Sequence, residues 1–148
     1  MITESLKSLY TRDLIKLKTE IEAYQNEEIL WKTDKNILNS AGNLCLHLIG
    51  NLNHFFGAVL GNSGYVRQRD LEFSLKNIPR TELIKNIDAT LTVVISTLDR
   101  LSTEDMEKAY PLEPLGYPMT VGFFMIHLIG HLEYHLGQIN YHRRLLDI

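Results

Sequence analysis

Apolar residues recur every three or four positions along four long segments of this chain, and this spacing constrains the fold more than any other feature. The four segments cover residues 3–28, 37–60, 80–101 and 120–146. None shows the alternation of polar and apolar residues that is typical of a half-buried strand. Long amphipathic helices can bury their apolar faces against one another. We therefore predict an all-α fold, a four-helix bundle, in a single domain over residues 1–148.

The connections between the predicted helices carry stop signals and breaks. Thr3 and Thr120 stand where the N-caps of the first and last helices are expected, and residues 61–64 (Gly-Asn-Ser-Gly) end the second helix. Residues 65–79 are mixed and polar, which predicts a long connection between helices 2 and 3. Helices 3 and 4 are joined by a proline-rich crossover, in which we expect an extended excursion with a short strand pair. Its prolines are Pro111, Pro114 and Pro118.

The length and charge of the chain exclude several classes of protein. A chain of 148 residues can bury a sizeable core without disulfides, and the single cysteine, Cys45, lies in an apolar run typical of an inert core thiol. The net charge of -3 gives no basic surface for nucleic acid. The sequence shows neither a secretory leader nor an apolar run long enough to cross a bilayer. We therefore expect a cytoplasmic protein with no membrane contact.

Four of the six histidines lie on the last predicted helix. His127, His131 and His135 are spaced four residues apart, and His142 follows. At the helical rotation per residue, all four fall within an arc of about 80° on one face. Histidines four residues apart sit on adjacent turns, about 6 Å apart along the axis, and can converge on one ion as the pair in HExxH does. By spacing alone, His127 and His131 form as good a pair as His131 and His135.

The surroundings of these histidines favour a site in which a metal ion or water pairs with their ring nitrogen atoms. The arc adjoins an apolar stripe, and burying unpaired imidazoles there is costly unless a metal or a water-filled groove satisfies them. The helix offers only one carboxylate, Glu133, which points away from the arc. A third ligand would come from another helix, where His47 occupies the middle of the second segment. Periodicity alone, however, places His47 with Asn43 and Asn51 on a solvated polar face.

Other well-known chemical motifs are absent. The chain contains no GxGxxG, P-loop, GxSxG or HExxH sequence, so nucleotide binding and the standard hydrolase mechanisms have no support. It also lacks the Glu-x-x-His pairs of carboxylate di-iron bundles. The histidines leave a metal site as a hypothesis, and a bis-histidine haem site, possible in principle, has no specific sign in the sequence.

Three segments of the chain resemble motifs of the DinB-like (DinB/YfiT) superfamily. Residues 127–139 contain a histidine pair, four residues apart, that ends directly before Leu-Gly-Gln, as in the last helix of that superfamily. Residues 43–51 look like its second-helix ligand segment. Residues 65–73 are similar to a connecting-loop motif of one uncharacterised DinB-like subfamily. The three segments also follow one another in the order found in the superfamily.

This resemblance implies a four-helix bundle with a divalent metal, nickel or zinc, bound by three histidines. By motif position the ligands are His47, His131 and His135. Residues expected to orient these imidazoles or the substrate are His127, Asn51, Tyr134 and Gln138. Since His127 stands upstream of the matching pair, the resemblance, and not the spacing, argues against it as a ligand.

The resemblance also implies an activity and an assembly. Characterised relatives include thiol-dependent S-transferases, so we expect a metal-dependent enzyme that acts on a small-molecule thiol and an electrophile. The alternative is a non-catalytic metal-binding module or a dimeric interaction module. Many members of the superfamily are homodimers, and apolar residues such as Phe123, Phe124 and Ile126 are available for such a contact.

Overall fold

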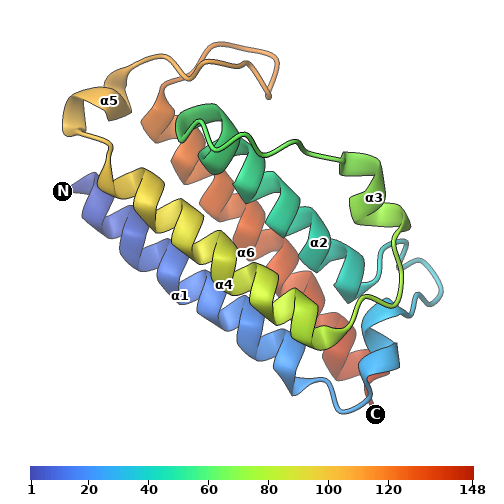
Figure 1. Cartoon of the computed structure of the whole chain (residues 1–148). Helices are drawn as coiled ribbons and strands as arrows, with labels where there is room; N and C mark the ends of the chain where they lie inside the picture. Colours follow the sequence, from blue (N-terminus) through green and yellow to red (C-terminus); the bar gives the residue numbers. More distant parts are fainter.

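The computed structural model describes residues 1–148 and is all-helical, with no strand (Figure 1). The long helices are α1 (Ile2–Ala23), α2 (Ala41–Leu52), α4 (Arg80–Asp99) and α6 (Val121–Leu146). Helix α2 continues without a break into the π-helical turns of η2 (Asn53–Leu60). The short elements are η1 (Glu27–Trp31), α3 (Arg69–Ser74) and α5 (Thr103–Glu107). The prediction of an all-α chain is confirmed.

The N-terminal ends of the predicted helices are placed correctly in two cases, at Arg80 and after Thr120, and wrongly in two. The Thr120 side chain caps α6 by accepting a hydrogen bond from the backbone of Phe123. Thr3 is not a cap, because α1 already begins at Ile2 and buries Thr3 within its first turn. The second long helix begins at Ala41, four residues later than predicted, because the side chain of Ser40 caps it.

The connecting segments contain short helices that the sequence pattern did not predict. α1 ends at Ala23, and part of the segment predicted to extend it forms the separate turn η1. The connection over residues 65–79 contains α3, which is too short and too polar to show a helical period. The proline-rich crossover is preceded by α5 and contains a single bridge between Ala109 and Thr120, so the expected strand pair is absent.

The long helices surround one apolar core. α1 packs against α4 and α6, and α2 packs against the same two helices (Figure 1). Twenty-seven buried apolar residues form this core, among them Phe124, which is therefore unavailable for the dimer contact expected of it. Deep in the core, the hydroxyl of Tyr10 on α1 donates to the carbonyl of Met125 on α6, over 2.7 Å.

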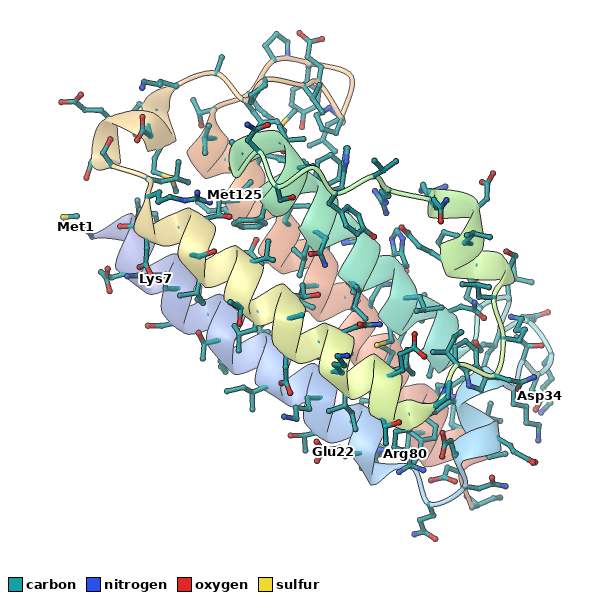
Figure 2. The ribbon with its side chains drawn as sticks, in the orientation of Figure 1. Met1, Lys7, Glu22, Asp34, Arg80 and Met125 are labelled. Carbon is teal, nitrogen blue, oxygen red and sulfur yellow. The ribbon has the colours of Figure 1, made fainter.

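Polar contacts close the end of the molecule where α4 begins. Figure 2 labels Arg80 close to Glu22 at this end, and the Arg80 guanidinium donates to the carbonyl oxygens of Glu22 and Tyr24, over 3.0 and 2.8 Å. These bonds join the start of α4 to the end of α1. None of the helices combines the length and the apolar character that crossing a bilayer requires.

Candidate metal centre

Three histidines from two helices meet inside the molecule. α2 supplies His47, and α6 supplies His131 and His135 from successive turns. One nitrogen atom of each ring lies within 4.8 Å of those of the other two, so the group could hold a metal ion. The Nε2 atoms of His47 and His131 are only 3.1 Å apart. The helical spacing of four residues brings the rings of His131 and His135 together, with centroids 4.6 Å apart.

A carboxylate behind His47 fixes the orientation of its ring. Oε1 of Glu72 lies 3.0 Å from Nδ1 of His47. Nη2 of Arg67 lies 3.3 Å from the same Nδ1 but donates over 2.9 Å to Glu72 Oε1, so the proton of the ring is assigned to Nδ1. In this tautomer the lone pair of Nε2 faces His131. A histidine that donates to a carboxylate through one nitrogen and presents the other is typical of metal sites.

The charge of Glu72 is maintained although its side chain is buried. Burial raises the pKa of Glu72, but the hydrogen bonds from Arg67 and His47 outweigh this effect and hold the pKa below its ordinary value. The Arg67 guanidinium binds both carboxylate oxygens, each over 2.9 Å. Glu72 is therefore an anion under neutral conditions and remains an acceptor for the His47 ring.

Two residues of α2 provide the space and the anchor for this carboxylate. A Cβ atom on Gly50 would overlap Oε2 of Glu72, so only glycine permits this close approach. The side-chain amide of Asn43 donates to the backbone carbonyls of Glu72 and Leu75, over 2.9 and 2.8 Å. Figure 1 shows the result, with α3 lying alongside α2.

The two histidines of α6 are held in the neutral form. Burial is the main cause that lowers the pKa of His131 to about 3, and the neighbouring His135 and His47 lower it further. Burial also lowers the pKa of His135, against the opposing effect of its hydrogen bond to Gln138. Only the neutral ring has a lone pair for a metal, so both rings are in the form that binds metal near pH 7.

Two buried polar atoms near this group lack any hydrogen-bond partner in the protein. They are Nδ1 of His131 and Oδ1 of Asn51. His131 therefore makes only one polar contact, with the Nε2 atom of another imidazole, and burying it in this state is costly. Three inward-facing imidazole nitrogens are ligands suited to zinc, nickel, copper or iron, so the donor set fits a divalent transition metal.

The residues expected to support the site differ in how they contact it. Gln138 accepts a hydrogen bond from Nδ1 of His135 over 2.7 Å, which leaves Nε2 of that ring for the cluster. Asn51 is buried, and the exposed Tyr134 packs its ring against His135 with centroids 5.2 Å apart. His127 lies outside the cluster, exposed and stacked on Phe124.

The remaining histidines belong to other environments. Both ring nitrogens of His142 are paired, with the hydroxyl of Tyr24 at 2.7 Å and the carbonyl of Lys32 at 2.8 Å. His54 packs against Phe55 and is not part of the cluster. The helix changes to π-type turns at Asn53, so His54 does not continue the α-helical spacing that begins at His47.

The interpretation of the α2 polar stripe as a solvated face is wrong. His47 is only 6% exposed, and Asn43 and Asn51 are buried as well. The connecting segment with α3 covers this stripe, and periodicity alone could not reveal what lies over a helix face. Arg67 and Glu72 were not identified as site residues, although both lie in the segment 65–73 whose motif carried part of the resemblance.

Comparison with known proteins places the chain in an uncharacterised family. The model of a family described as "Protein of unknown function (DUF1572)" matches residues 4–147, and the chain belongs to this family. No curated protein matches the chain.

Proposed function

We propose that this member of the DUF1572 family is a divalent-metal-dependent enzyme, most concretely a low-molecular-weight thiol S-transferase. The observation that carries the proposal is the convergence of His47, His131 and His135, with one nitrogen of each within 4.8 Å of the others. We further propose that the four long helices form the four-helix bundle of the DinB-like superfamily. We propose nickel or zinc as the metal, because three neutral imidazoles suit both ions and the resemblance to the DinB-like superfamily implies them.

The chemistry of a thiol transfer matches what such a site offers. His47, His131 and His135 would hold the divalent cation, which would supply a Lewis acid that lowers the pKa of a thiol and favours the nucleophilic thiolate. In the transfer, the sulfur forms a bond to an electrophilic carbon as the bond to the leaving group breaks with its electron pair. The thiol proton goes to solvent.

The residues of the chain have separate roles in this proposal. Glu72 accepts the Nδ1 proton of His47, and Gln138 accepts that of His135, so both rings present Nε2 to the ion. These hydrogen bonds hold the ligands in the binding orientation before the ion arrives. Arg67 neutralises Glu72 by donating to both of its carboxylate oxygens. Asn51 offers a buried, unpartnered carbonyl oxygen for the substrate or a water.

The test begins with metal content and proceeds to turnover. We expect the purified protein to bind one nickel or zinc ion per chain, measured by elemental analysis and calorimetric titration. The metal-loaded protein should consume a bacterial thiol in the presence of an activated aryl halide faster than the variant His131→Ala does. His127→Ala is the matched control, since His127 lies on the same helix but outside the cluster. Turnover no faster than that of His131→Ala, with several thiols, would refute the transferase.

The second candidate, a non-catalytic dimeric module, is favoured by an apolar surface at the start of α6. Phe123 and Ile126 are 50% and 54% exposed, and the exposed Tyr117 packs near Phe123. We propose that this surface joins two copies as a homodimer. Light scattering should find a dimer for the natural chain and a monomer for Phe123→Asp. A metal that only stabilises the fold, with no turnover, would favour the module over the enzyme.

A further inference from the structure

A pocket of about 540 Å³ opens beside the histidine cluster, between residues 36–39 and the C-terminal half of α6. His135 belongs to both the pocket wall and the cluster, and its partner Gln138 also lines the pocket. Sites for small organic molecules usually enclose about 300–1,000 Å³, so the pocket has the size of such a site.

The wall of this pocket contains no aspartate, glutamate, lysine or arginine. His142 contributes to it, but hydrogen bonds within the protein occupy both of its ring nitrogens. The amide groups free to bind a ligand come from Asn36, Asn39 and Gln138. An ionic group that lost its water here would meet no opposite charge, which is a costly arrangement. The chemistry of the wall therefore selects against charged ligands.

Large apolar side chains are exposed around the same pocket. Leu38 is 85% exposed and Leu145 is 61% exposed, and the exposed rings of Tyr134 and Tyr141 line the same wall. Apolar surface gathered around a concave site is typical of a place where a ligand is bound. Because tyrosine rings pack well against flat rings, the two tyrosines favour a ligand with a flat part about the size of an aromatic ring.

We propose that this pocket binds an uncharged small organic molecule with an apolar, aromatic-sized body and one hydrogen-bonding group directed at Gln138. We identify this molecule with the electrophilic substrate of the proposed transferase, and this part of the inference rests on the proposed function. Binding itself depends on the pocket and not on the ion. The pocket therefore selects the electrophile, and the ionic groups of a thiol remain outside it.

The experiment measures binding of 2-naphthol, which is uncharged at neutral pH, and of its anionic analogue 2-naphthoate. Calorimetry is performed on the full chain after chelation and again after zinc loading. We expect one 2-naphthol per chain in both states, and at least tenfold weaker binding of 2-naphthoate to the chelated protein, in which no bound cation attracts its carboxylate. Leu38→Glu should weaken 2-naphthol at least fivefold, because it places a charge at the rim. Ile15→Glu, an equally apolar exposed site on α1, should change the affinity less than twofold.

Each other result overturns the proposal. It is wrong if 2-naphthol does not bind, if 2-naphthoate binds as tightly, or if Leu38→Glu has no effect. It is also wrong if Leu38→Glu dissociates a dimer while 2-naphthol fails to bind, since the occupant would then be a second copy. His131→Ala separates the two proposals, because it should lose zinc and keep 2-naphthol. Absence of turnover in the zinc-loaded natural chain, with intact 2-naphthol binding, would contradict the transferase and leave the pocket assignment standing.

Discussion

His131 and His142 lie on one face of the same helix, about three turns apart, yet their surroundings differ in kind. Each nitrogen of His142 has a protein partner, from Tyr24 on one side and Lys32 on the other. His131 has a buried nitrogen with no partner and a second nitrogen that faces another imidazole. The comparison shows that helical spacing places a histidine, while its hydrogen-bond partners distinguish a core residue from a ligand.

The largest expected effect is the stabilisation by metal and its loss in His131→Ala. A ligand present at a thousand times its dissociation constant stabilises the native state by about 4 kcal/mol. We expect the natural chain to gain this much with zinc, measured by thermal unfolding with and without chelator. His131→Ala should gain almost nothing, because only two imidazoles remain. An equal gain in both proteins would show that His131 is not a ligand.

The next effect concerns His142 and has nothing to do with metal. Replacing it by leucine leaves the carbonyl of Lys32 unpaired and removes the ring that receives the Tyr24 hydroxyl. The Tyr24 hydroxyl keeps the carbonyl of Ile139 as a partner. Each unsatisfied buried group costs about 1–3 kcal/mol, so His142→Leu should lower the free energy of unfolding by about 1–3 kcal/mol. Denaturant unfolding measures this loss, with exposed His127→Leu as the matched control. The zinc affinity of His142→Leu should stay unchanged, and a lowered affinity would place His142 in the metal site.

The histidine cluster and the surroundings of His142 also show how much of the structure could be predicted from the sequence alone. The long helices and the convergence of histidines four residues apart on α6 were predictable, because both depend on spacing within one helix. Spacing alone, however, did not choose between His127 and His135 as the partner of His131. The burial of His47 was not predictable, because the residues that cover it lie in a separate segment of the chain. Glu72 reaches His47 only because Gly50 lacks a side chain and Asn43 anchors the backbone, and neither feature has a local signal. Periodicity therefore predicted which helix faces carry the candidate ligands. The contacts that bury and orient those ligands come from distant segments of the chain and could not be predicted in this way.

A smaller effect is expected from the carboxylate that orients His47. Glu72→Gln keeps the shape but weakens the acceptor, and its amide group can turn a donor toward Nδ1, which favours the wrong tautomer. Changes of this kind cost about 10- to 100-fold in metal affinity. Calorimetric zinc titration should show this weakening with one ion per chain still bound. Glu133→Gln, a carboxylate on the outer side of α6 paired with Arg12, is the control and should leave the affinity unchanged.

The smallest effect is expected from His131→Leu without metal. In the metal-free protein this substitution removes the unpartnered Nδ1 of His131, but it also takes away the hydrogen-bond partner of the buried Nε2 of His47. Because the two effects oppose each other, we expect the free energy of unfolding to differ from that of the natural chain by less than about 1 kcal/mol, both in the presence of chelator. With zinc the natural chain should become the more stable of the two, because only it gains the energy of the ion. If His131→Leu were as destabilising as His142→Leu under chelator, the two histidines would both be structural, and the contrast between them would fail.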